Sequence, residues 1–318
     1  MDLLELRAEG VYCAAGDFYI DPWETVERAV ISNAGRARAG CGAYLTARSG
    51  AGLVAQRTAA GAGIQTAAYG ERKAMGDAMV SLHPAGYMPG SAQVRIELGG
   101  EVWVFASDFR PAVDGTCEPF EPIRCHTLLT GAAFALPIFR WPAVEETMAA
   151  IHEWWRSNRE AGKTSVLYAA PLGLAQRVLS RMDVSMGGIW LHEEVERYCA
   201  IYRAGGIDLP AGGEERSATL KIVPPGSTPG SGERGARVST AMVSGWMRIR
   251  GTRRRRSLDR GFVLSGQADW PEILGAIDAT GAETVWVLHG FRAPLGRWLE
   301  EHGRRARVVE TRFEETEG

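Results

Sequence analysis

Three side chains of metal-ligand type each follow an apolar, strand-like run of the chain: Asp21, Asp108 and His289. Carboxylates and imidazoles bind divalent cations when several strand ends bring them together. Each residue also has a plain structural interpretation. Asp21 precedes Pro22 and can begin a turn, Asp108 can cap a loop, and His289 can be a hydrogen-bonded residue at a strand end. The residue types alone leave both interpretations open.

A fourth apolar run, in residues 28–40, stops abruptly at a small polar loop. The loop reads Ser32-Asn-Ala-Gly-Arg-Ala-Arg38 and carries two arginines. A fifth run ends in His83-Pro-Ala-Gly-Tyr87. The chain therefore repeats one arrangement, a strand followed by a polar loop tip, which is how a rigid sheet presents functional residues.

The composition is that of a globular protein with one large domain or two. The chain has 318 residues, 45% hydrophobic content and ten tryptophans, which is ample for a packed core. The formal net charge is -2, and Lys73, Lys163 and Lys221 are the only lysines. The excess of arginine fits either a codon bias or phosphate binding, and both remain open.

Cysteine usage and hydropathy favour a cytoplasmic protein without membrane contact. The five cysteines form no C-x-x-C pair and no framework spacing, which indicates free thiols in a reducing compartment. The first residues lack a basic segment followed by an apolar one, and no run approaches the roughly 20 apolar residues that span a bilayer.

Residues 1 to about 135 are predicted to be β-rich. Short apolar or alternating runs between Gly- and Pro-containing turns predict strands at 10–13, 18–20, 29–31, 93–97, 101–105 and 127–130. Residues 46–60, rich in Ala and Gly, are a weaker helix prediction. We expect helices to cover one face of this β structure.

From about Trp141 the pattern changes to alternating helices and strands, which predicts a parallel sheet. A helix is predicted over 142–156 with Pro142 at an early position, followed by a strand at 165–169, a helix at 172–179, a strand at 188–192, a helix at 194–203 and a strand at 219–223. A surface loop is predicted at 224–236. The chain is then expected to return to the first domain, with 261–265, a helix at 271–279, a strand at 284–289 and a helix at 293–303.

Several motifs give the chain a family resemblance. They are Tyr12-Cys-Ala-Ala-Gly-Asp-Phe-Tyr-Ile-Asp-Pro22, Leu82-His-Pro-Ala-Gly86, Gly90-Ser-Ala-Gln-Val-Arg-Ile-Glu97, Val263-Leu-Ser265 and Ala268-Asp-Trp-Pro271. With them the chain resembles the metallo-β-lactamase-fold nucleases of the β-CASP group, and among these the bacterial ligase-associated DNA exonucleases, also called mRNA 3'-end processing factors. The resemblance implies an αββα sandwich in residues 1–138 and 259–318, with an inserted β-CASP α/β domain in residues 139–258.

The resemblance also implies a site for two zinc ions, but this chain departs from it. The family's zinc ligands would fall on seven residues that cannot serve in the same way: Asn33, Gly35, Ala37, Arg38, Tyr87, Gly131 and Gln267. Asp21, Asp108 and His289 match retained ligand positions, and the spacing of 22 residues from Gln267 to His289 is that of the family. We therefore interpret these three as relics of a catalytic metal site and expect no bound metal cofactor. His83 and His192 match no ligand position and are interpreted as structural.

Two buried carboxylates without a metal would need another counter-charge. We therefore predict that Arg36 or Arg38 takes over the electrostatic role of the metal by pairing with Asp108, Asp21 or both. A guanidinium at that place would also repel a dication.

A basic run near the end of the inserted domain is the candidate nucleic-acid contact, because arginines bind phosphates through charge and paired hydrogen bonds. It comprises Arg248, Arg250, Arg253, Arg254, Arg255 and Arg256. A solvated loop explains the run equally well.

Three functions are compatible with the sequence. The first is a pseudoenzyme that keeps a nucleic-acid-binding surface and acts as a scaffold for an active nuclease, a ligase or a helicase in DNA repair or RNA processing. The second is an active phosphodiesterase with one metal at Asp108 and His289. The third is a protein that binds an anion or a small molecule in the emptied pocket, with Tyr87 and Arg38 as recognition groups.

Overall fold

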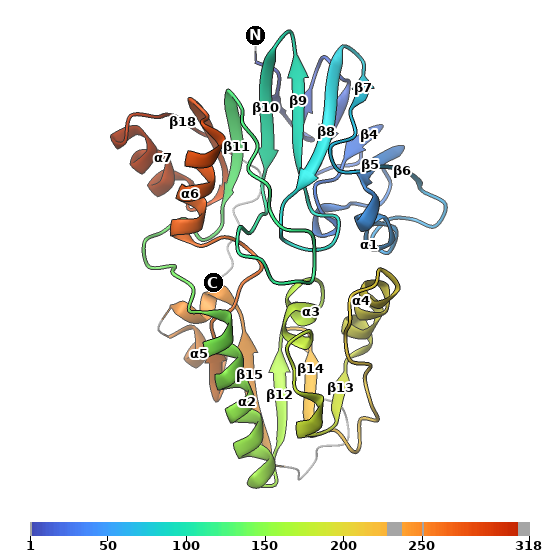
Figure 1. Ribbon diagram of the computed structural model, residues 1–318, viewed down its shortest axis with the longest axis vertical. Coiled ribbons are helices and arrows are strands. Elements are labelled where there is room, and N and C mark those ends of the chain that lie inside the picture. Colours follow the sequence, from blue (N-terminus) through green and yellow to red (C-terminus); the bar gives the residue numbers. More distant parts are fainter. Residues whose placement is uncertain (1, 228–236, 250, 311–318) are drawn as a thin grey trace. The chain divides into compact units, whose positions relative to one another are not determined.

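The protein is a mixed α/β chain of two compact units. The computed structural model describes residues 2–227, 237–249 and 251–310 (Figure 1). The first unit comprises Met1–Pro137 together with the chain from Gln267 onward, and the second comprises Ile138–Gly266. The second unit is thus an insertion into the sequence of the first.

The first unit contains a six-stranded sheet whose strands follow one another in chain order. Its strands are β1 (Glu5–Arg7), β2 (Gly10–Cys13), β3 (Phe18–Ile20), β4 (Arg28–Val30), β5 (Ala43–Ala47) and β6 (Gly63–Ala67). The pairs β1/β2 and β2/β3 are antiparallel, and the pairs from β3 to β6 are parallel. The parallel part places the carboxyl ends of β3 and β4 at one edge, where Asp21 and the Asn33 loop follow.

A second sheet of seven strands completes the β structure of this unit. In spatial order it contains β18 (Arg305–Val308), β17 (Thr284–Gly290), β11 (Thr127–Ala132), β10 (Glu101–Ala106), β9 (Ala92–Leu98), β8 (Ala78–Pro84) and β7 (Lys73–Met75). Strands β7 to β10 form an antiparallel meander, as the alternation of Val94 and Ile96 with polar residues predicts. Strands β10, β11, β17 and β18 are parallel, so Asp108 and His289 follow strands with the same direction.

The two sheets pack face to face. One apolar cluster joins Val30 and Leu45 of the six-stranded sheet to Val94 and Phe105 of the seven-stranded sheet. On the opposite face of the seven-stranded sheet, a second cluster joins β10, β11 and β17 to the helices α6 (Trp270–Thr280) and α7 (Arg292–Glu301). Helix α6 begins where the sequence predicts, because Asp269 and Glu272 form a capping box and Pro271 lies in its first turn.

The predicted helix over residues 46–60 is confirmed only for Ala51–Ala55. Thr46 and Ala47 end strand β5, a 3-10 turn follows at Arg48–Gly50, and helix α1 covers only Ala51–Ala55. Strand β5 lies between β4 and β6, and its backbone is paired on both sides. Burial of Tyr44 and Leu45 in this position outweighs the helix preference of the Ala-rich segment.

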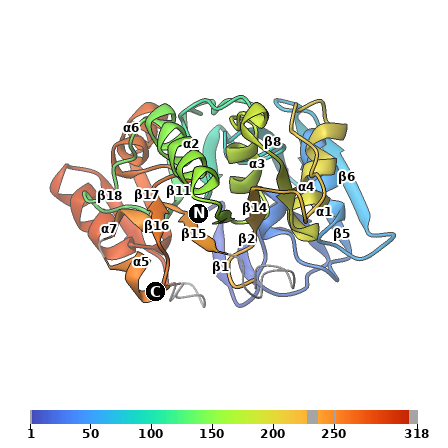
Figure 2. The ribbon, with the colours of Figure 1, turned by 90° about the horizontal axis from the view of Figure 1, so that it is seen from below.

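The second unit contains a five-stranded parallel sheet, as the alternating pattern predicts. Its spatial order is β13 (Ile189–Leu191), β14 (Leu220–Val223), β12 (Thr164–Tyr168), β15 (Val238–Val243) and β16 (Arg260–Phe262). The helices are α2 (Val144–Glu160), α3 (Leu174–Leu179), α4 (Glu193–Ala204) and α5 (Thr252–Arg255). Figure 2 views this sheet along its strands. Helix α2 packs against the sheet through fully buried residues such as Trp155, whose Nε1 donates to Thr219 Oγ1.

Two sequence expectations for this region need correction. Pro142 precedes helix α2 and its N-cap rather than lying in its first turn. Strand β16 pairs with β15, so residues 260–262 belong to the sheet of the second unit and not to the first domain. The ring of its Phe262 packs against Trp154 of α2 at a centroid distance of 5.7 Å. Most of the loop expected at 224–236 lies outside the described residues.

Within the described residues, no helix combines the length and apolar character that a membrane span requires.

Candidate functional site: a hydrogen-bonded carboxylate at the sheet edge

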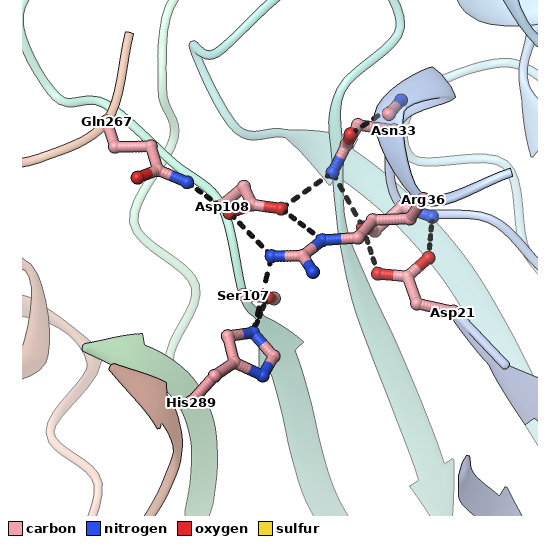
Figure 3. A network of polar contacts seen from close by, with 9 residues as sticks. Asp21, Asn33, Arg36, Ser107, Asp108, Gln267 and His289 are labelled. Carbon is pink, nitrogen blue, oxygen red and sulfur yellow. Dashed lines mark hydrogen bonds and ion pairs between the residues drawn. The ribbon is translucent and has the colours of Figure 1, made fainter. Parts of the chain in front are cut away.

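Asp108 is the centre of a polar network in the first unit (Figure 3). It follows β10 and is only 6% exposed. Arg36 Nε donates to Oδ2 at 2.7 Å and Arg36 Nη2 donates to Oδ1 at 3.0 Å, so the guanidinium binds the carboxylate with two parallel hydrogen bonds. Asn33 Nδ2 donates to Oδ2 at 3.1 Å and Gln267 Nε2 donates to Oδ1 at 2.5 Å. The predicted pairing of an arginine with Asp108 is confirmed, and the arginine is Arg36.

These four hydrogen bonds use the whole acceptor capacity of Asp108, because an ionised carboxylate offers about four lone-pair positions. Two of the donors, Asn33 and Gln267, stand where the family resemblance places histidine ligands. Burial alone would raise the pKa of Asp108, but the charge and hydrogen bonds of Arg36 outweigh it and hold the pKa below its usual value. Asp108 therefore remains ionised with its charge already balanced.

The local backbone explains why Arg36 reaches Asp108 and Arg38 does not. Asn33 caps the 3-10 turn Ala34–Arg36, where its Oδ1 accepts from Gly35 N at 3.0 Å. The Arg36 side chain is partly buried against Asp108, whereas Arg38 lies beyond the turn and is exposed. The Arg38 carbonyl accepts a hydrogen bond from Tyr44 Oη at 2.7 Å, which fixes the backbone there.

Asp21 lies next to this network but has different partners. Its carboxylate accepts hydrogen bonds from the backbone N–H and the hydroxyl of Ser32. Asp21 is 7% exposed and adopts a φ of 45°, a left-handed conformation that aspartate tolerates better than most residues. Burial raises the pKa of Asp21 to about 6, although the Ser32 hydrogen bonds and the charge of Arg36 act in the opposite direction.

His289 contacts Ser107 and Arg36 rather than a carboxylate. Its Nε2 lies 2.7 Å from Ser107 Oγ and 3.4 Å from Arg36 Nη2. Because a guanidinium can only donate, Nε2 must be the unprotonated acceptor, and the ring proton belongs on Nδ1. Burial and the charge of Arg36 lower the pKa of His289 to about 4, so the ring is neutral at pH 7. The same Nε2 lone pair would be needed to bind a metal from this side.

The other positions that the resemblance assigns to zinc ligands have no room for a side chain, carry no donor atom or do not line the cavity at Arg36. A Cβ on Gly131 would lie 2.4 Å from the Ser107 carbonyl oxygen, and Gly131 falls at a register shift between β11 and β17. Ala37 is buried and carries no donor atom. Tyr87 donates its backbone N–H to Ser91 Oγ and is absent from the lining of the cavity at Arg36.

The donor set does not fit a pair of zinc ions. No cluster of three or more His, Cys, Asp or Glu side chains suited to a metal occurs among the residues that the structure describes. Of the three side chains that the sequence singled out as possible metal ligands, Asp108 is saturated by N–H donors, His289 Nε2 is already an acceptor, and the carboxylate of Asp21 is bound by Ser32. The guanidinium of Arg36 already places a positive charge against Asp108, where a metal cation would have to bind.

A cavity of about 480 Å³ opens beside this network, entirely within the first unit. Its polar wall includes Asp21, Arg36, Ser107 and His289. The remaining lining residues are Val11, Ile20, Pro22, Trp23, Gly35, Ala37, Arg38, Ala39, Arg57, Phe105 and Leu288. Ser32, Ser107 and Arg57 were not predicted from the sequence. The two serines directly precede Asn33 and Asp108, which is the one hint that the sequence gives.

Part of the predicted arginine run lines a second cavity, of about 570 Å³, in the second unit. Arg253 and Arg254 of helix α5 line it together with Arg260 of β16, Met247 and Ile249. Arg260 was not predicted from the sequence. Three members of the run lie elsewhere: Arg248 Nε donates to the Ile138 carbonyl, Arg255 Nη2 donates to Thr252 Oγ1, and Arg256 is exposed. The remaining member, Arg250, lies outside the described residues.

The two histidines interpreted as structural have structural surroundings. His83 lies 3.0 Å from Ser81 Oγ, and burial lowers its pKa. His192 is the N-cap of α4, where its Nδ1 accepts from Glu194 N at 3.2 Å. Neither residue takes part in the network around Asp108.

A solved structure shares the fold of this chain. A crystal structure of a protein of unknown function from Enterococcus faecalis V583 superposes with a TM-score of 0.58 over 90% of this chain and 79% of that chain, at 10% sequence identity. This similarity establishes a shared α/β fold.

In sequence, the chain is 28% identical over 242 residues to a protein of Opitutus terrae named "Probable DNA ligase". The match covers 73% of this chain and 24% of that protein, so the chain spans about a quarter of the length of its relative. No family model matches the chain.

Proposed function

We propose that the protein is a relative of the β-CASP nucleases that has exchanged its zinc site for an ion pair and binds nucleic acid without hydrolysing it. In this proposal it is a scaffold for an active protein of DNA repair or RNA processing, such as a nuclease, a ligase or a helicase. Two features support a metallo-β-lactamase fold with a β-CASP insertion. The first unit has two face-to-face sheets with helices on an outer face, and the α/β unit is inserted in the sequence between β11 and β17.

The observation that carries the proposal is the saturation of Asp108. A bridging carboxylate must offer lone pairs to two cations. In this chain, Arg36, Asn33 and Gln267 donate four hydrogen bonds to those lone pairs. A one-metal phosphodiesterase at Asp108 and His289 would have to break these bonds and displace a guanidinium, which makes it the weaker alternative.

Two observations support nucleic acid as the partner. The relative named "Probable DNA ligase" connects a similar sequence with DNA. Arg253, Arg254 and Arg260 gather three guanidiniums at one cavity in the second unit, next to the apolar side chains of Met247 and Ile249. Charged and apolar groups at one site suit a strand that presents both phosphates and bases.

The test is binding of a labelled single-stranded DNA at 50 and 200 mM salt, with hydrolysis followed in parallel with and without Mn²⁺ or Zn²⁺. If three phosphates are contacted, affinity should fall roughly 20-fold over this salt range. For single strands, each contact adds about 0.7 to the steepness with which the logarithm of the affinity falls against the logarithm of the salt concentration, which is called the salt slope below. Replacing Arg253, Arg254 and Arg260 by Gln should lower the slope by about 2. No nucleotide release is expected under any condition.

The control variant replaces Arg159, Arg197 and Arg216 by Gln, which removes the same charge from exposed positions of the second unit. Its affinity and salt slope should stay close to those of the wild type. Absence of DNA binding at 50 mM salt, or equal losses in the two triple variants, would refute the proposed DNA-binding site. Metal-dependent nucleotide release that disappears in Asp108→Ala would instead establish the phosphodiesterase.

A further inference from the structure

The open edge of strand β6 lies outside the site described above. Strand β6 is the last strand of the six-stranded sheet (Figure 1), and β5 is its only strand neighbour among the residues that the structure describes. All five residues, Gly63–Ala67, pair with β5 in a continuous parallel register. Gly63 and Gln65 are exposed, and Ile64 and Thr66 are partly exposed. The backbone N–H and C=O groups that point away from β5 form a template for one further strand.

The other edge strands of the three described sheets carry protection that β6 lacks. Charged side chains discourage the pairing of an edge strand with another chain. They occur on four of these strands: Glu5 and Arg7 on β1, Lys73 on β7, Arg305 and Arg307 on β18, and Arg260 on β16. Strand β13 has no charge, but it has only three residues, and its Ile189 carbonyl accepts a hydrogen bond from Gly213 N at 2.8 Å. Strand β6 is the longest of the six edge strands and reads Gly-Ile-Gln-Thr-Ala, without a charged residue.

We infer that strand β6 binds a second copy of this chain, whose own β6 adds to it antiparallel about a two-fold axis at Gln65. This register pairs every residue of both strands: Gly63 lies opposite Ala67, Ile64 opposite Thr66, and Gln65 opposite its own copy. Like charges directly opposite each other would destabilise such a pair, and β6 has none. A glutamine amide both donates and accepts, so the two Gln65 side chains can form a hydrogen bond with each other.

The composition of β6 suits a strand partner of the same sequence. Ile64 and Thr66 are β-branched and lie opposite each other twice in the antiparallel pair, and β-branched side chains pack well on a pleated surface. Pairing of five residues buries much less than the roughly 800 Å² per partner of a stable interface. The dimer is therefore weak and forms at high protein concentration. This inference concerns assembly and does not depend on the proposed binding of nucleic acid.

The experiment measures the average mass of the full chain by sedimentation equilibrium at protein concentrations from about 1 to 200 µM, a range that suits a weak dimer. The mass of the wild type should rise from 34.5 kDa toward twice that value. Gln65→Lys and Gln65→Glu each place two like charges at the axis, so each variant alone should stay at 34.5 kDa. An equimolar mixture of the two variants places Lys opposite Glu and should recover the association. Recovery in the mixture also shows that both variants are folded.

A matched control is Leu6→Lys, which places the same charge at the centre of β1, the opposite edge of the same sheet. Leu6 is also exposed, and this variant should associate like the wild type. A wild type that remains at 34.5 kDa at the highest concentration would overturn the inference. Three other results would do the same: Gln65 variants that associate like the wild type, a mixture of them that stays monomeric, or an equal loss of association in Leu6→Lys.

Discussion

Replacing Arg36 by Met is expected to lower the free energy of unfolding of the first unit by about 3–5 kcal/mol, the cost of leaving one partner of a buried ion pair alone. Asp108 is 5% exposed in its side chain, and its charge would be stranded next to Asn33 and Gln267, which can donate hydrogen bonds but supply no charge. Chemical denaturation of the full chain, followed by tryptophan fluorescence, measures the change.

Two further variants separate this effect from a general loss of packing. Arg38 lies in the same loop, and its exposed side chain has no partner among the described residues. Arg38→Met should therefore change the free energy of unfolding by no more than about 0.5 kcal/mol. Adding Asp108→Asn to Arg36→Met removes the stranded charge and should recover part of the loss. If Arg36→Met lowers the free energy of unfolding by less than about 1 kcal/mol, the ion pair does not stabilise the first unit in the way that we describe.

The second large effect is a dependence of stability on pH that arises from the carboxyl group of Asp21. Its pKa is about 6 in the folded chain against 3.8 for the free side chain. The folded state therefore binds the proton more tightly, and the associated stability is present below about pH 4 and lost as pH rises through 6. A rise of this size corresponds to roughly 3 kcal/mol. Asp21→Asn keeps a side chain that can accept from Ser32 N and donate to Ser32 Oγ, without the charge.

The expected result is a difference that depends on pH. Asp21→Asn and the wild type should have similar stability near pH 4, and the variant should become the more stable protein as pH rises to 7. His289 acts in the opposite direction, because its pKa of about 4 adds stability that is lost as pH falls below 6.5. The difference between variant and wild type isolates Asp21, since His289 is common to both. If the difference in free energy of unfolding between the two proteins stays constant from pH 4 to 7.5, the Asp21 carboxylate does not carry the destabilising buried charge that we describe.

Features of the fold that depend on local pattern could be predicted from the sequence. Period-two alternation located β9 and β10, and the helix predicted over 271–279 corresponds to α6, Trp270–Thr280. Residues 46–60 show the limit of such patterns. Their composition favours a helix, but the position of β5 between two parallel strands is a tertiary property that no local preference reports.

The sequence allowed us to predict which kinds of charged group pair at the site, but not the geometry of that pairing. Two carboxylates and two arginines pointed to an ion pair, but the choice of Arg36 depends on a 3-10 turn of three residues capped by Asn33. The role of Ser107 was hidden because its partner, His289, lies 182 positions away along the chain. Gly131 resembled a lost ligand, and the structure adds that the Ser107 carbonyl leaves no room there for a side chain.

The most direct test of the proposed exchange of metal for an ion pair is the metal content of the purified protein after incubation with zinc or manganese and desalting. The saturated carboxylate and the charge of Arg36 predict less than about 0.1 metal ion per chain, because retention requires several deprotonated ligands with free lone pairs. The same measurement on Arg36→Met shows whether removal of the guanidinium alone restores binding. About two metal ions per wild-type chain would contradict the exchange, since Asp108 would then be a metal ligand and not the partner of Arg36.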